Sequence, residues 1–229
     1  QLFVHRIRHA LLHLDKVRLD HFIGYVNYWA VPCPVSAVDG LPQLPENALG
    51  GSWEKARPDD FFPLLQALFP VERFIAEDLG ILNGEVCSFR DKYGLPGMIV
   101  LQFCFEESVP RPREYPAERY LYTGTHDNPT IREWFEHLDP DSPSRKNLLA
   151  FIRGNRNLFA GLGLEDIADI ERSIHRILCL IAQSSGCQNI IIPAQDIVGL
   201  GSSARMNVPG AALGNWQWRL TDFDELLQV

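Results

Sequence analysis

Apolar and polar residues alternate along this 229-residue chain with two different periods. Short apolar runs of strand length recur, and between them apolar residues repeat at spacings of three and four, the spacing of a helix that buries one face. The predicted strands are residues 17–20, 73–76, 98–105, 119–123 and 189–194. Strands that alternate with helices indicate an α/β fold built on a parallel sheet.

Six segments have helical spacing, and residues that start or stop helices bound several of them. The predicted helices are residues 1–14, 59–69, 84–93, 129–137, 144–159 and 164–183. We expect Gly94 to end one helix in the left-handed conformation. We expect Asn128 to cap another helix, with Pro129 at its first position.

Residues 33–58 form a long stretch rich in proline and glycine that fits neither period. Irregular loops of this length are uncommon unless they have a function. Trp53 within the stretch favours a loop insertion packed near an active site, and a surface loop without a function is the alternative. No Gly/Ser-rich linker divides the chain, which predicts a single domain over residues 1–229.

Composition excludes several function classes. The net charge of −8 argues against a nucleic-acid partner. No apolar run approaches the roughly 20 residues of a membrane span, which predicts no membrane partner and makes the cytoplasm the expected compartment. The five cysteines have no CxxC spacing, so we expect reduced thiols and no metal site.

Two further patterns are weak signals for a ligand. Residues 199–204 match the GxGxxA dinucleotide fingerprint, but no acidic residue closes a second strand about 20 residues later. His175 lies beside the apolar stripe of a predicted helix, where a structural role is the simpler interpretation. We therefore predict no cofactor.

An arginine and an acidic residue share one face at the end of the first predicted strand. Residues two apart on a strand point the same way, so the Arg18 guanidinium should hold Asp20 ionised. A permanently charged carboxylate suits a nucleophile. The alternative is an ion pair on an exposed strand.

Two more acidic residues follow predicted strands. Glu77 stands after its strand as Asp20 does after its own, and burial beside apolar walls would raise its pKa towards that of a general acid. Asp127 lies in a strand-to-helix turn next to His126. Because the carboxyl ends of parallel strands gather on one rim, the three acids predict an active site there.

Glycoside chemistry needs such a set of acids. A retaining enzyme uses one carboxylate as nucleophile and one carboxylic acid as proton donor, about 5–5.5 Å apart. Aromatic side chains give flat surfaces for sugar faces, and Tyr25, Tyr28 and Trp29 follow the first acid. Packing of these aromatic residues against the fold is the alternative.

Five motifs of the chain resemble the 4-α-glucanotransferases, also called amylomaltases or disproportionating enzymes, of glycoside hydrolase family 77. The motifs are VRLDHFIGYVNYWAVP, FIAEDLG, GLPGMIVLQFCF, YTGTHDN and QDIVGLGSSARMNVPGAALGNWQWRL. They occur in the family's order between residues 17 and 220. The tail over residues 195–219 is the most specific of them.

The resemblance implies a fold and an activity. The fold is a (β/α)8 TIM barrel, of which this chain supplies roughly the last five β/α units. The activity is retaining transfer of α-1,4-glucan segments, with maltooligosaccharides, starch or glycogen as substrates and no cofactor. The missing N-terminal half of the enzyme is the expected partner, and the chain alone is expected to be inactive. A plant or algal source would imply a plastid.

The resemblance also implies roles for individual residues. Asp20 resembles the nucleophile, Glu77 the general acid/base and Asp127 the residue that stabilises the transition state. The residues that resemble substrate-binding positions are Arg18, His21, Phe103, His126 and Asn207. Pro129 departs from the family pattern, which should affect only a helix start.

Two alternative functions remain open at this point. An α-glucan hydrolase of the α-amylase group would share the acids, and its products would only become shorter, whereas transfer lengthens some of them. A catalytically silent glucan-binding remnant would bind glucan without turnover.

Overall fold

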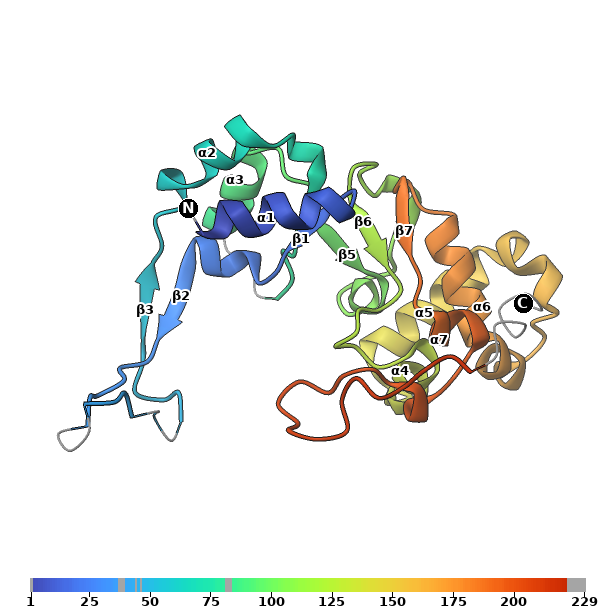
Figure 1. The fold of residues 1–229 in the computed structure, drawn as a ribbon. Helices are drawn as coiled ribbons and strands as arrows, with labels where there is room; N and C mark the ends of the chain where they lie inside the picture. Colours follow the sequence, from blue (N-terminus) through green and yellow to red (C-terminus); the bar gives the residue numbers. More distant parts are fainter. Residues whose placement is uncertain (1, 37–39, 44, 46, 81–83, 222–229) are drawn as a thin grey trace. The chain divides into compact units, whose positions relative to one another are not determined.

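The computed structural model describes residues 2–36, 40–43, 45, 47–80 and 84–221. The chain forms two compact units, residues 1–97 and 98–229, which are called unit 1 and unit 2 here. Both contain parallel strands connected by helices, so the predicted α/β class is confirmed at this level (Figure 1). Within the described residues, no helix has the length and apolar character needed to span a membrane.

Unit 1 contains two short parallel strands and three α-helices. The strands are β1 (Val17–Leu19) and β4 (Phe74–Ala76), and they pair with Leu19 opposite Ala76. The helices are α1 (Leu2–His13), α2 (Phe62–Leu68) and α3 (Gly84–Lys92). Gly94 follows α3 with a φ of 61°, the left-handed conformation that the sequence predicts.

Unit 1 also contains a β-hairpin that the sequence did not predict. Strands β2 (Asn27–Ala30) and β3 (Ser52–Lys55) pair antiparallel, with Trp29 opposite Trp53 (Figure 1). The prediction of an irregular loop over residues 33–58 is therefore wrong at residues 52–55, which form β3. The connection between the two strands is far longer than the two to five residues that give a hairpin its local sequence signal.

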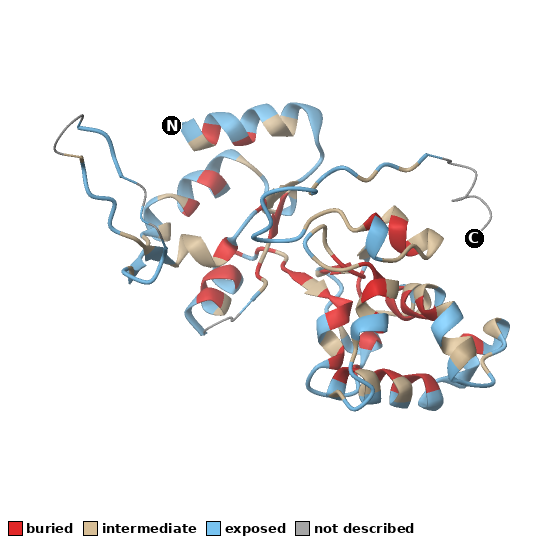
Figure 2. Cartoon of the chain, turned by 90° about the horizontal axis from the view of Figure 1, so that it is seen from below, coloured by how far each residue is buried: buried red, intermediate tan, exposed pale blue. Residues whose placement is uncertain are grey.

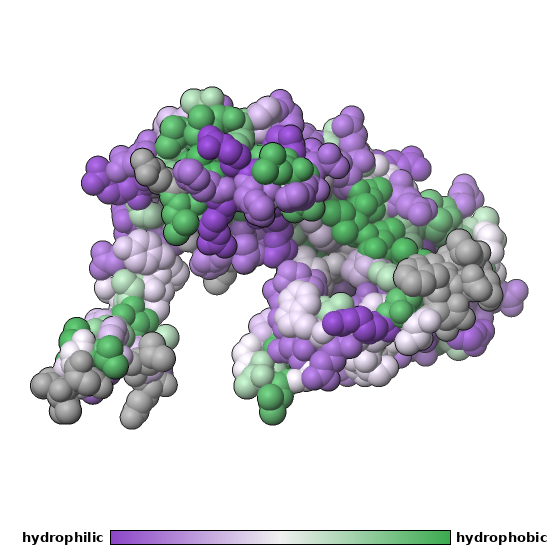
Figure 3. All heavy atoms as spheres, in the orientation of Figure 1, coloured by the Kyte–Doolittle hydropathy of each residue, from purple (hydrophilic) through white to green (hydrophobic). Residues whose placement is uncertain are grey.

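Aromatic side chains form a large part of the core of unit 1. Phe62 packs against Phe22, Phe89 and Tyr93 at ring-centroid distances of 6.1, 4.7 and 5.4 Å. Val4 and Ile7 bury one strip of α1, whose other faces are exposed (Figure 2). Apolar patches lie among hydrophilic side chains on the surface of unit 1 (Figure 3). Leu2 on α1 and Leu64 on α2 are exposed apolar residues.

Unit 2 contains a three-stranded parallel sheet in the order β5-β6-β7. The strands are β5 (Met98–Val100), β6 (Tyr120–Tyr122) and β7 (Asn189–Ile191). The helices are α4 (Ile131–His137), α5 (Pro143–Gly154), α6 (Ile167–Gln183) and α7 (Ala194–Val198). The strand predicted over residues 98–105 is wrong beyond Val100, because residues 101–105 turn into a 3-10 helix, η4.

Several helix boundaries also differ from prediction, among them the start of α4 and the end of α5. Asn128 does not cap α4. Instead, the Thr130 side chain accepts a hydrogen bond from the backbone N–H of Glu133, and the helix begins at Ile131. Helix α5 ends at Gly154 and is followed by a 3-10 segment, η6 (Arg156–Leu162), where the sequence predicted a helix that continues to residue 159.

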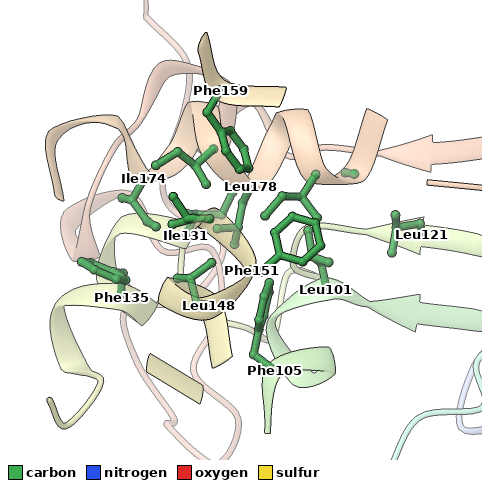
Figure 4. Close-up of a cluster of buried hydrophobic side chains, with 14 of the residues drawn as sticks. Leu101, Phe105, Leu121, Ile131, Phe135, Leu148, Phe151, Phe159, Ile174 and Leu178 are labelled. Atoms are coloured by element: carbon green, nitrogen blue, oxygen red, sulfur yellow. The ribbon is translucent and has the colours of Figure 1, made fainter. Parts of the chain in front are cut away.

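The core of unit 2 lies between its helices and η4. Side chains of α4, α5 and α6 converge there with Leu101 and Phe105 (Figure 4). The apolar stripe of α6 is buried at Ile174 and Ile177, whereas Ile167 at the start of the helix is 46% exposed. Strand β6 ends at Tyr122 beside this core, and polar residues follow it from Thr123 to Asn128.

Candidate active site

The pairing of β1 with β4 places Asp20 and Glu77 at equivalent positions. Because Leu19 lies opposite Ala76, each acid is the first residue after its strand. The backbone N–H of Glu77 donates to the Leu19 carbonyl at 3.0 Å, and that of Phe22 donates to the Glu77 carbonyl at 3.1 Å. The two acidic residues therefore share one hydrogen-bonded frame at the carboxyl end of the strand pair.

Arg18 forms an ion pair with Asp20, on the side of the strand that both residues share. The Asp20 side chain is 73% exposed, and the Arg18 side chain is 26% exposed. A substrate atom can therefore reach the carboxylate while the guanidinium holds it in place. This is the arrangement that the sequence predicted for the two side chains.

His21 lies between the two acids and has a strained backbone. Its φ of 49° is in the left-handed region, which costs a residue other than glycine about 1 kcal/mol or more. In this conformation its backbone N–H donates to Glu77 Oε2 at 2.5 Å. A Cβ at Gly24 would lie 2.8 Å from His21 Cδ2, so glycine is required beneath the ring.

The environment of Glu77 raises its pKa, the direction that the sequence predicts. Burial is the largest cause, and the negative charge of Asp20 adds to it, whereas the backbone N–H of His21 and the charge of Arg18 lower the pKa. The next residue, Asp78, is buried and pairs with Arg90 at 2.6 Å, which gives it a structural role. Glu77 is therefore the acidic residue of unit 1 whose surroundings favour a proton donor.

The aromatic residues near these acids have different surroundings. Tyr25 packs against Phe62 at a centroid distance of 5.4 Å, so the packing alternative holds for it. Trp29 donates from Nε1 to the Ala48 carbonyl at 2.7 Å and lies 5.5 Å from Trp53. Trp53 is 67% exposed and Tyr28 44%, so these two rings of the hairpin are open to a ligand.

In unit 2, Asp127 lies in the turn between β6 and α4. Asn128 shapes this turn, since its Oδ1 accepts from both the backbone N–H and the hydroxyl of Thr125, at 2.8 and 2.7 Å. The Thr125 hydroxyl in turn accepts from the backbone N–H of Asp127 at 3.3 Å. Asn128 is thus a turn residue, and the Asp127 side chain is left to other partners.

The Asp127 carboxylate is held by residues from two segments. Asn207 donates from Nδ2 to Asp127 Oδ1 at 2.6 Å, and His126 Nε2 lies 3.4 Å from Oδ2. Arg205 donates to the Asp127 backbone carbonyl at 3.0 Å. The structure therefore brings together Asp127, His126 and Asn207, three of the predicted site residues.

Sequence reasoning about single residues missed Arg205 and Glu133. Arg205 forms an ion pair with the buried Glu133 at 3.3 Å, which anchors the residue that holds the Asp127 backbone. Arg205 and Glu133 lie 72 positions apart in the chain, so no local pattern connects them. The only signal is that Arg205 belongs to the tail motif that resembles the family.

A cavity of about 170 Å³ lies beside this turn. Its lining includes His126, Arg205 and Trp216, and the rings of His126 and Trp216 lie 5.0 Å apart. Phe103 lies on η4 and is 45% exposed. Within the described ranges, no group of three or more His, Cys, Asp or Glu side chains is arranged to hold a metal ion.

Asp196 fixes both ends of the Asp127 turn, and its only sequence signal is that it belongs to the tail motif. Its carboxylate is buried and accepts from the Thr123 hydroxyl at 2.7 Å and from the Ile131 backbone N–H at 2.8 Å. Thr123 precedes the turn and Ile131 begins α4. Burial raises the pKa of Asp196, and these two hydrogen bonds lower it.

Replacing Asp196 by alanine should destabilise the chain by about 2–4 kcal/mol, because two buried groups lose their partner. Asp196→Asn is the matched control, since its amide can accept from Ile131 and donate to the Thr123 hydroxyl. We expect it to stay within about 1 kcal/mol of the unchanged protein. Urea unfolding followed by circular dichroism measures both, and equal stability of the alanine variant would contradict this role.

Comparison with known proteins supports a family assignment. Residues 1–225 match the family model described as 4-alpha-glucanotransferase. The chain is 37% identical to the chloroplastic/amyloplastic 4-alpha-glucanotransferase of Arabidopsis thaliana over 98% of its own length. It is 36% identical to the 4-alpha-glucanotransferase of Aquifex aeolicus over 96% of its own length.

A solved structure agrees with this result. An amylomaltase from Streptococcus agalactiae, in complex with acarbose, matches 99% of the chain with a TM-score of 0.78 and 26% identity. The chain spans 35% of the Arabidopsis enzyme, 41% of the Aquifex enzyme and 41% of the Streptococcus chain. By the match of its sequence over nearly its whole length, the chain belongs to the family of 4-alpha-glucanotransferases.

Proposed function

We propose that the protein transfers α-1,4-glucan segments from a donor to an acceptor glucan or glucose, with retention of configuration. The observation that carries this proposal is the pair of Asp20 and Glu77, which occupy equivalent ends of β1 and β4 but have different surroundings. One acid is exposed and paired with an arginine, and the other is half-buried with a raised pKa. Two carboxyl groups with separate roles are what retaining glycoside chemistry requires.

In the first half of the proposed reaction, Asp20 attacks the anomeric carbon of the donor sugar and forms a glycosyl ester. Glu77 gives its proton to the oxygen of the leaving glucan. In the second half, Glu77 takes a proton from a hydroxyl of the acceptor sugar, and that oxygen displaces Asp20. The cycle ends with Asp20 ionised and Glu77 protonated, as at the start.

The remaining predicted site residues are proposed to bind and orient the sugar. Asp127, held by Asn207 and next to His126, is proposed to accept hydrogen bonds from sugar hydroxyls as the ring distorts. Arg18 and His21 are proposed to position the two acids and to contact the reacting sugar. Phe103 is exposed and is proposed to pack against a sugar face.

The proposed substrates are maltooligosaccharides, starch or glycogen. Two observations support an α-glucan ligand: the exposed rings of Tyr28 and Trp53, and the solved amylomaltase of Streptococcus agalactiae, which is in complex with acarbose. We propose no nucleic-acid or membrane partner and no cofactor. The proposed compartment is the cytoplasm, or a plastid if the source is a plant or alga.

We also propose that the chain is part of a (β/α)8 barrel. The five parallel strands of the two units would form part of a single (β/α)8 barrel domain, as the last five or so β/α units. The long insertion over residues 33–58 would lie near the active site. The missing N-terminal half of the enzyme would supply the other strands, and the 229-residue chain alone would be inactive.

The test of this function is the length of the products. The full-length gene product, incubated with maltotriose, should yield glucose together with maltooligosaccharides longer than maltotriose, and proton NMR should show new linkages of the α configuration. Products that only become shorter would show hydrolysis instead. Maltotriose that binds but is never converted would indicate a silent glucan-binding protein.

A further inference from the structure

A second cavity in unit 2 shares no lining residue with the cavity beside Asp127. Its volume is about 820 Å³, and three segments line it: residues 109–114, the end of α5 with the start of η6, and Ser184. Four arginines contribute to its walls, and it is called the arginine groove here. The arginines are Arg111, Arg113, Arg153 and Arg156.

The arginine groove has an excess of positive charge. Its lining contains one carboxylate, Glu114, which lies 3.5 Å from Arg111 in an ion pair. The side chains of the other three arginines form no ion pair or hydrogen bond with any described residue. Four positive groups therefore face one negative group, on a chain whose net charge is −8.

Two ordinary explanations account for only part of this charge. Helices α5 and α6 both end near the groove, at Gly154 and Gln183, and each helix C-terminus carries about half a negative charge. Together they offset about one of the arginines, which leaves an excess of about two positive charges. A neighbouring cavity of about 510 Å³ shares Arg153 and Arg156 and is also lined by Glu165 and Asp166, but among the described residues neither acid forms an ion pair with these two arginines.

The chemistry of the walls favours a phosphate group. The planar guanidinium has five donors in a fork that matches phosphate oxygens, and a phosphate monoester carries nearly two negative charges at neutral pH. The Asn157 side chain adds an amide, and buried Phe151, seen in Figure 4, contributes an apolar wall. The volume lies in the range of cavities that hold a whole small molecule and exceeds what a free phosphate ion needs.

We propose that the arginine groove binds a small phosphate monoester of sugar size, at a site separate from the proposed glucan site. The phosphate would lie among Arg113, Arg153 and Arg156, and the sugar would contact Phe151 and Asn157. A nucleic acid fits less well, because the acidic surface implied by the net charge repels an extended phosphate backbone.

The test is a calorimetric titration of the 229-residue chain with glucose 6-phosphate, repeated with the full-length gene product. We expect saturable binding that weakens as salt is added. Glucose should not bind measurably, and inorganic phosphate should bind at least about tenfold more weakly, since it makes none of the sugar contacts. Equal binding of glucose, equal binding of inorganic phosphate, or tighter binding of a single-stranded oligonucleotide would overturn the assignment.

Two variants locate the binding in the groove. The double variant Arg113→Gln/Arg156→Gln removes two arginines that have no partner among the described residues, so the fold should be kept. It should weaken glucose 6-phosphate binding by about 100-fold, about tenfold for each charged hydrogen bond lost. Arg176→Gln, on α6 outside the lining, is the control and should change affinity less than about twofold. Unchanged affinity in the double variant would place any binding elsewhere and overturn the proposal.

Discussion

Replacing Asp20 by asparagine should abolish glucan transfer by the full-length gene product. The amide has almost the same shape as the carboxylate, but it cannot form the glycosyl ester on which the proposed mechanism depends. We expect kcat/KM for maltotriose to fall by about 10⁴-fold or more, as when a covalent nucleophile is removed from other enzymes. The release of glucose, followed by a coupled assay, measures the loss.

The fold should not change in this variant. Asp20 is largely exposed, and its partner Arg18 can still donate to the amide oxygen of an asparagine. Asp60→Asn is the matched control, because Asp60 is another exposed acid of unit 1 that pairs with an arginine. The control should keep full activity, and both variants should unfold at the temperature of the unchanged protein. Retention of most of the transfer activity by Asp20→Asn would rule out its role as nucleophile.

Local sequence patterns were enough to predict the parallel strands and the pair of acids in unit 1. All five predicted strands contain an observed strand, because each is a short apolar run without helical spacing. Asp20 and Glu77 could be matched because both directly follow such a run, and the register of β1 with β4 places them together. The raised pKa of Glu77 follows from the same position beside buried residues.

Features that depend on contacts between distant parts of the chain could not be predicted in this way. Asn207 and Arg205 reach Asp127 across about 80 positions, and Asp196 reaches Ile131 across 65. The long connection between β2 and β3 hides their pairing in the same way. No periodicity records such contacts, and the resemblance of the tail motif to a family was the only sequence signal for Asn207.

The prediction of Asn128 as the cap of α4 was wrong for a different reason. Asn128 and Thr130 are both good capping residues, two positions apart, and propensity alone favours Asn128 slightly. The structure uses Asn128 Oδ1 to close the turn at Thr125, which leaves Thr130 to cap the helix. Asn128 has the stronger preference for capping, but its side chain forms hydrogen bonds within the turn that holds Asp127.

The second large effect is expected from Glu77→Gln. This variant should lose transfer from maltotriose by about 10²–10⁴-fold, the usual contribution of general acid–base catalysis, because glutamine cannot protonate the leaving oxygen. A donor such as α-maltosyl fluoride needs no proton for its leaving group, so it should still react with Asp20. The glycosyl ester should then accumulate, because no base activates the acceptor, and mass spectrometry of the intact protein should detect it.

The pH dependence gives a separate measurement of the same role. A proton donor must be protonated, so the rate with maltotriose should fall as the pH rises through the pKa of Glu77 in the enzyme. Burial raises that pKa above its ordinary value of 4.5, so the fall should come at higher pH than for an exposed glutamate. With the fluoride donor, formation of the ester in Glu77→Gln should lose this high-pH limb. A variant that still transfers from maltotriose at the full rate, or that never forms the ester with the fluoride, would assign the proton donor to another residue.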